Sequence, residues 1–161
     1  MKELLKPIRE QWLMVKRSAQ QECEARGLEQ MARKYRDCDM FKGDETLGEL
    51  AGKLLSPQGL EFCVKKGFPN IATFRLFKGY KPQQYGVYID AGDVTLRNPG
   101  RVLLVGRTFA TVICDTTERH EVAAMHGAVA MVLASKWAVV RITQGAGTTI
   151  TKRTADNAII L

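Results

Sequence analysis

The stretch from Phe109 to Ile142 reads FATVICDTTERHEVAAMHGAVAMVLASKWAVVRI, and apolar residues occupy alternate positions through most of its length. This alternation is typical of β-strands that bury one face. When residues 92–161 are written with a step of about 18, small and apolar residues stack in columns. Two of these columns hold Gly92, Ala110, Ala128 and Ala146, and then Val94, Val112, Ala130 and Thr148.

The repeat predicts a β-solenoid. Each repeat contains two alternating strands of about five residues joined by turns, which gives a coil of about 18 residues with two strands per coil. A strand this short cannot bury its inward side chains alone, whereas stacked coils form a continuous core. We therefore expect a single-stranded β-solenoid of about four coils over residues 92–161, with an interior too narrow for a ligand cavity.

The first half of the chain has the period of helices. One helix face is marked by apolar residues at steps of three and four, namely Leu5, Ile8, Trp12, Val15, Ala19 and Cys23. Asp44 or Thr46 can cap a second helix, and Ser56 is the expected cap of a third. Four phenylalanines lie between Phe62 and Phe77, and their helical spacing predicts a small aromatic core.

The change of period divides the chain into three parts. We predict an α+β fold with a helical domain over residues 1–80, a connector over 81–91 and the β-solenoid over 92–161. Because the ends of a solenoid are open sheet edges, we expect the helical domain to cap the first coil. The last residues are apolar and lie in mid-strand, so this end either pairs with another chain or continues into further coils.

Composition excludes several classes of protein. With 161 residues, 45% of them hydrophobic and 25% charged, the chain has ordinary globular composition, which excludes disordered and fibrous classes. It has no apolar run long enough for a membrane span, and its charged start is unlike a signal peptide, so we expect a cytoplasmic protein. The four cysteines have the spacing of neither a metal knuckle nor a disulfide framework, and we expect free, mostly buried thiols.

Three short units suggest a family. Phe109–Cys114, Gly127–Val132 and Trp137–Ile142 resemble the A-x-V-x-A units of uncharacterised bacterial β-solenoid repeat proteins. The resemblance covers residues 92–161 and implies an architecture but no catalytic residues. Hexapeptide-repeat acyltransferases fit less well, because a step of six from Leu96 meets several polar residues. The repeated GGxGxD units of calcium-binding rolls are missing, so we expect no calcium.

Candidate site residues are few. Arg101, Arg119 and Trp137 fall in one column at a step of about 18, which predicts a basic and aromatic stripe along the rod and a binding surface there. The two histidines, His120 and His126, are the natural general bases. We expect His120 to lie inward and bond a turn carbonyl, and His126 to lie in a short turn.

These observations favour a non-enzymatic structural or protein-interaction module, without metal or cofactor, that self-associates or binds a protein partner. We expect a homo-oligomer formed through the solenoid end or the N-terminal helix. One alternative is an acyltransferase-like enzyme that uses His120 or His126. Another is nucleic-acid binding through the basic helices, since the net charge is +7, although acidic residues are interleaved with the basic ones there.

Overall fold

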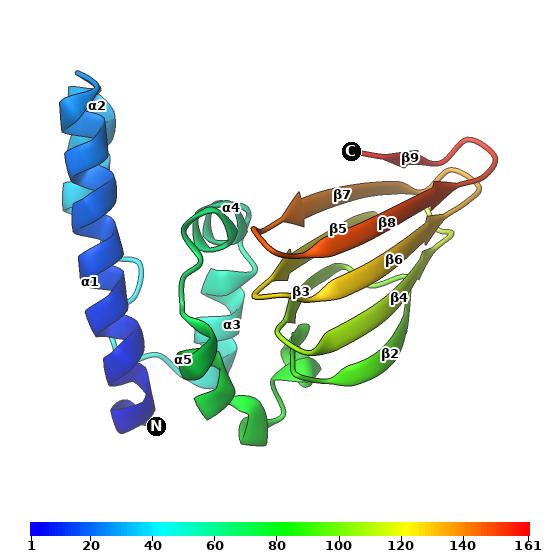
Figure 1. The fold of residues 1–161 in the computed structure, drawn as a ribbon, viewed down its shortest axis with the longest axis horizontal. Helices are drawn as coiled ribbons and strands as arrows, with labels where there is room; N and C mark the ends of the chain where they lie inside the picture. Colours follow the sequence, from blue (N-terminus) through cyan, green and yellow to red (C-terminus); the bar gives the residue numbers. More distant parts are fainter.

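The computed structural model describes all 161 residues as a helical region followed by parallel strands (Figure 1). Helix α1, Lys2–Ala25, and helix α2, Glu29–Asp37, form a hairpin that reverses at Gly27, whose φ is 70°. The predicted apolar stripe of α1 is confirmed, because its buried residues are Leu5, Ile8, Trp12, Ala19 and Cys23. The stripe packs on the chain's own helices.

Three short helices follow: α3 (Leu47–Leu54), α4 (Pro57–Lys66) and α5 (Ile71–Leu76), and after them the 3₁₀ turns η1 (Lys78–Tyr80) and η2 (Pro82–Tyr85). The caps set their starts, as the sequence predicts. The hydroxyl of Thr46 accepts a hydrogen bond from the backbone N–H of Glu49, and the hydroxyl of Ser56 accepts one from Gly59.

An aromatic cluster fills the centre of the helical region. Trp12 lies with its ring centroid 5.3 Å from those of both Phe41 and Phe62, in edge-to-face geometry. Phe68 packs beside them, and Phe74 is also buried. The predicted aromatic core is confirmed, with Phe41 and Trp12 as members that join it from outside the phenylalanine-rich segment.

The strands form two parallel sheets. Sheet A has the order β1-β3-β5-β7-β9, and sheet B has the order β2-β4-β6-β8. Sheet A contains β1 (Val87–Ile89), β3 (Arg101–Val105), β5 (Arg119–Met125), β7 (Val139–Gln144) and β9 (Ile159–Ile160). Sheet B contains β2 (Gly92–Arg97), β4 (Thr108–Cys114), β6 (Val129–Ala134) and β8 (Thr149–Thr154). One strand from each sheet makes a coil, so the predicted β-solenoid of about four coils with two strands per coil is confirmed.

The coil period differs from the predicted step of about 18. Ala110 pairs with Ala130, and Ala130 pairs with Ile150, so these coils repeat at roughly 20 residues. The first coil is shorter, because Val94 pairs with Ala110 instead of with its predicted partner Val112. The predicted column of Val94, Val112, Ala130 and Thr148 is therefore wrong. The predicted and the observed steps are both even and keep the same residues inward, so alternation alone does not distinguish them.

Sheet A is buried on both faces along most of β3 and β5, whereas β7 and β9 have exposed outward residues. Its inward residues, such as Leu104 and Val122, pack with sheet B inside the solenoid. Its outward residues Leu103, Val105 and Met125 belong to the core that contains the helical region's aromatic cluster. Parallel strands covered on both faces are expected to be apolar at nearly every position, as residues 102–105 of β3 and 122–125 of β5 are.

The helical region therefore caps the solenoid along its flank, over the outer face of sheet A. Figure 1 shows the helices gathered on one side of the strands. Strand β1 lies within the segment 81–91 that the sequence predicts as a connector, and it pairs with β3. No helix has the length and hydropathy needed to cross a membrane. Sheet B has no such cover, and its outer face is left at the surface.

Candidate interaction surface

The outer face of sheet B carries an apolar surface on two neighbouring strands. In-register ladders place Phe109 of β4 beside Val129 of β6, and Ile113 beside Leu133. Met131 lies between Val129 and Leu133 on β6, and Phe109 and Met131 keep 48% and 38% of their surface exposed. We call these five residues the apolar face. Two of these side chains are exposed and three are half-buried, and together they form a contiguous apolar patch that is a candidate interaction site.

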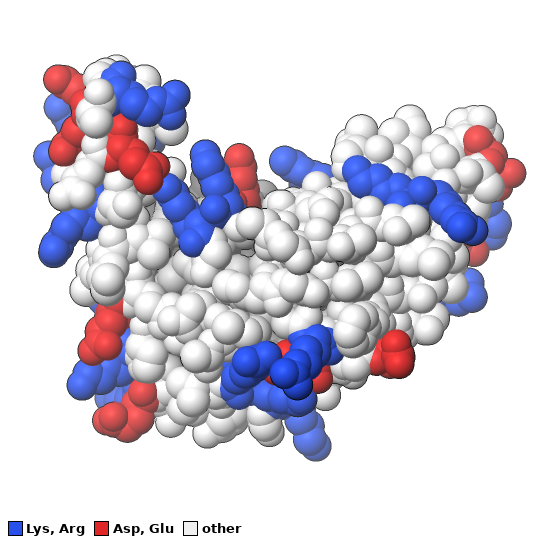
Figure 2. Space-filling model, in the orientation of Figure 1, with Lys and Arg blue, Asp and Glu red and all other residues white.

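Charges border the apolar face. Asp93 and Arg97 point outward from the two ends of β2, and their ladder partners are Phe109 and Ile113. Arg153 of β8 lies beside Leu133. None of these three charged side chains belongs to an ion pair within the chain. Figure 2 shows uncharged surface over β4 and β6, with Lys and Arg gathered over β8.

The predicted stripe of Arg101, Arg119 and Trp137 does not form. Because the coil is longer than predicted, Arg101 pairs with Glu121, and Arg119 pairs with Val139. Trp137 lies in the turn before β7 with 67% of its surface exposed. The structure brings the two arginines together around Glu121 but places them in different columns, and Trp137 lies outside both. Their role in binding stays a prediction.

Both arginines face a buried carboxylate. Arg101 Nε lies 2.7 Å from Glu121 Oε2, and Arg119 Nε lies 3.6 Å from the same oxygen. The Glu121 side chain is only 4% exposed, so it needs a cationic partner to be stable there. Arg101 therefore stabilises the fold, because it neutralises the buried Glu121 carboxylate on sheet A.

The histidines hold the fold together. His120 is 1% exposed; its Nδ1 is 2.7 Å from the carbonyl oxygen of Pro99, and its Nε2 is 3.2 Å from that of Thr116. His120 therefore bridges two turns, which confirms the predicted contact with a turn carbonyl. His126 lies in the turn after β5, as predicted, and its Nε2 is 2.7 Å from the carbonyl oxygen of Pro69 in the helical region. Both ring nitrogens of His120 have partners within the chain, whereas only Nε2 of the half-buried His126 does.

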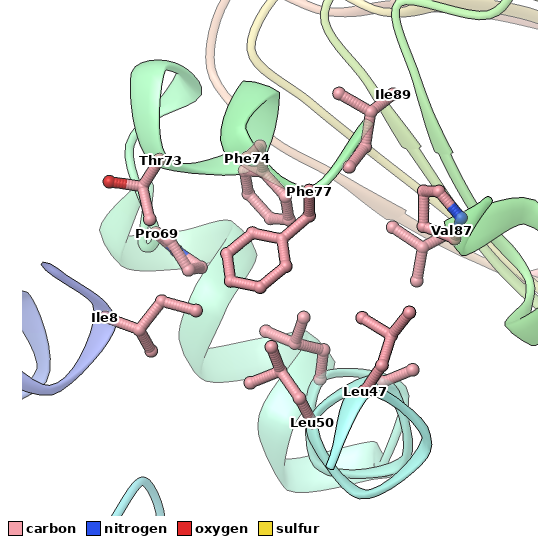
Figure 3. Close-up of a pocket in the computed structure, with 12 residues that line it drawn as sticks. Ile8, Leu47, Leu50, Pro69, Thr73, Phe74, Phe77, Val87 and Ile89 are labelled. Carbon is pink, nitrogen blue, oxygen red and sulfur yellow. The ribbon is translucent and has the colours of Figure 1, made fainter. Parts of the chain in front are cut away.

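The cavity between the helical region and the solenoid is small and apolar. It lies between the helical region and β1, where Phe77, Leu50 and Val87 surround the same space (Figure 3). Its volume of about 20 Å³ is about the room of one water molecule. No titratable side chain lines it, and Thr73 supplies the single hydroxyl. This cavity is a gap in packing, too small for an organic substrate.

Three of the four cysteines are buried, and Cys38 is half-buried. All four cysteines are free, as predicted, and burial raises the pKa of the Cys63 thiol to about 12 and that of Cys114 to about 11. Thiols with raised pKa values are poor nucleophiles. Asp90, a carboxylate in the turn before β2, pairs with Arg75. No group of three metal-ligating side chains comes together.

The basic helices carry charges of both signs. On the α1–α2 hairpin, Arg9 pairs with Asp39 and Lys66 of α4 pairs with Glu22. Figure 2 shows blue and red side chains intermixed at this end of the molecule. A phosphate backbone prefers an uninterrupted basic surface, and this hairpin does not offer one.

The fold and these surfaces define the class of protein: a parallel β-solenoid with a helical cap on one flank and an apolar face on the other. Comparisons with protein-family models, curated proteins and solved structures found no match. The apolar face was missed by sequence reasoning, although its signal is present. Strands β4 and β6, TFATVIC and VAMVLA, have apolar residues in both phases of their alternation, which indicates that both faces avoid water.

Proposed function

We propose that the chain is a non-catalytic protein-interaction module that binds a protein through the apolar face of sheet B. One observation carries the proposal: on the outer side of two adjacent strands, five apolar side chains are exposed or half-buried, and charged residues of β2 and β8 lie beside them. Burying them against a partner would gain about 25 cal/mol per Å² of apolar area removed from water. The parallel ladders hold these side chains in a fixed array, so little conformational entropy is lost on binding.

The enzymatic alternative has less support. An acyl transfer by His120 would require substrate to reach a ring that is 1% exposed. His126 uses its Nε2 to bond Pro69 and so joins the helical region to the solenoid, and no acid, base or nucleophile pairs with its ring. We therefore assign both histidines to stability.

The test places a photo-crosslinking benzophenone amino acid at Met131, in cells that produce the chain from its own gene. We expect one discrete protein adduct, identified by mass spectrometry, that disappears when Phe109→Glu is added. The matched control carries the probe at Arg33, which is exposed on α2. The absence of any adduct at Met131, or adducts that survive Phe109→Glu, would contradict the proposal. Circular dichroism of each variant checks that it folds.

A further inference from the structure

We infer that the occupant of the apolar face is a second copy of this chain, with the two B sheets stacked face to face and their strands running in opposite directions. The inference rests on the proposed function and names the partner. The two-fold axis would follow the central outward column of sheet B, which contains Thr95, Thr111, Met131 and Thr151. An isologous contact of this kind closes as a dimer.

The charges of β2 select this arrangement. Asp93 and Arg97 lie at opposite ends of β2, point to the same side, and have no ion-pair partner in their own chain. Reversing the second copy about the central column places its Arg97 opposite Asp93, and its Asp93 opposite Arg97. Two equivalent ion pairs then form at the border of the interface, where they fix its register.

The apolar residues match in the same arrangement. Phe109 would face Ile113 of the second copy, and Val129 would face Leu133 of the second copy, while Met131 would meet its own equivalent. On β4 an aromatic side chain thus meets a branched one, and on β6 two branched side chains of different size meet. Sheets stacked face to face lie about 10 Å apart, which is the distance that such side chains fill.

The other two-fold arrangement is disfavoured by charge. An axis parallel to the strands would place Arg97 opposite Arg153 of the second copy and leave Asp93 opposite Thr149. Like charges brought together at an interface select against that arrangement. Pairing of the β8 edge is also disfavoured, because Lys152 and Arg153 lie on that strand, and charged edge strands resist pairing.

The size of the face predicts a weak dimer. Four strands about 4.8 Å apart, with six residues rising about 3.3 Å each, give a surface of roughly 20 by 20 Å. This area is about half that of a standard interface on each partner. We expect a dissociation constant of about 10 to 100 µM.

The test is sedimentation equilibrium of the whole chain, from micromolar concentrations to the highest soluble concentration, at about 0.15 M salt, where the Debye length is about 8 Å. We expect a monomer–dimer equilibrium. Asp93→Arg or Arg97→Asp alone should weaken the dimer about tenfold or more. Each substitution places two like charges opposite each other at both of the symmetry-related contacts. The double exchange Asp93→Arg with Arg97→Asp should restore the dimer to within about threefold, because the opposite signs face each other again.

The control Arg33→Glu changes the net charge on α2 and should leave the dimer unchanged. A chain that stays monomeric at every concentration, or a double exchange that does not restore association, would overturn the inference. If the purified chain is monomeric while the Met131 probe captures a different protein that Phe109→Glu releases, the proposed function stands and self-association fails. If the probe captures nothing and the purified chain is also monomeric at every concentration, both fail.

Discussion

At the scale of single residues, Asp90 fastens the helical region to the solenoid. Its Oδ2 accepts a hydrogen bond from Arg75 Nε at 2.7 Å, and its Oδ1 accepts one from the backbone N–H of Arg107 at 2.8 Å. Asp90 has a φ of 44°, which Asp and Asn tolerate better than most residues. The Arg75 guanidinium outweighs partial burial and, together with the Arg107 N–H, lowers the pKa of Asp90 to about 2.

We expect Asp90→Asn to lower the free energy of unfolding at neutral pH by about 1 kcal/mol, because it removes a partly exposed ion pair and keeps the other contacts. A carboxyl whose pKa is lower in the folded chain stabilises it above the unfolded pKa of about 3.9 and loses that effect as the pH falls to about 2. The difference between native chain and variant should therefore vanish over this range. Urea denaturation at several pH values measures it, and a difference independent of pH would count against the assignment.

At the scale of elements, the contact between α3 and α4 depends on a glycine. Gly59 lies in the first turn of α4, and a methyl group there would overlap the carbonyl oxygen of Lys53 in α3. Helix propensity alone predicts that alanine is better than glycine by about 1 kcal/mol. Packing of the two backbones reverses that preference.

We expect Gly59→Ala to destabilise the chain by about 2 kcal/mol, since the two helices must move apart. Gly52→Ala is the matched control, because Gly52 lies inside α3 and a methyl group there meets nothing within 4 Å. That control should stabilise the chain by up to about 1 kcal/mol. Thermal denaturation compares the two, and equal effects of the same sign would refute the close contact.

At the scale of the whole molecule, sheet A joins the two cores. Its outward Leu103 packs in the core with the helices, while its inward neighbour Leu104 packs inside the solenoid. Unfolding either core would expose apolar residues of sheet A to water and so destabilise the other core. The molecule should therefore unfold in one cooperative transition.

Leu103→Ala tests this coupling, and we expect it to cost about 2 to 5 kcal/mol, because Leu103 is fully buried. In a Trp137→Phe background, Trp12 is the only tryptophan and reports on the helical region. The transition seen by Trp12 fluorescence and the β-sheet signal in circular dichroism should shift together. Two separate midpoints would show that the helical region and the solenoid unfold independently.

Local features were readable from the sequence because they depend on neighbouring residues. The N-caps at Thr46 and Ser56, the apolar stripe of α1 and the strand alternation all follow from short-range rules. The coil period could not be predicted from the sequence, because small and apolar residues form columns equally well at the predicted step of about 18 and at the observed step of roughly 20. A subtler signal lies in the turns, where Lys136 and Asp156 occupy equivalent positions of successive coils with φ values of 57° and 58°.

Periodicity and caps are local properties of the chain, so they alone predict that helices precede a stack of short strands. Contacts between distant segments set which residues become neighbours in the ladder, and they place Glu121, in place of Arg119, beside Arg101. They also determine that the helices cover sheet A and leave Phe109 and Met131 on sheet B exposed. Alternation divides each strand into two faces, but only packing between distant segments determines which apolar face is buried within the chain and which remains for a partner.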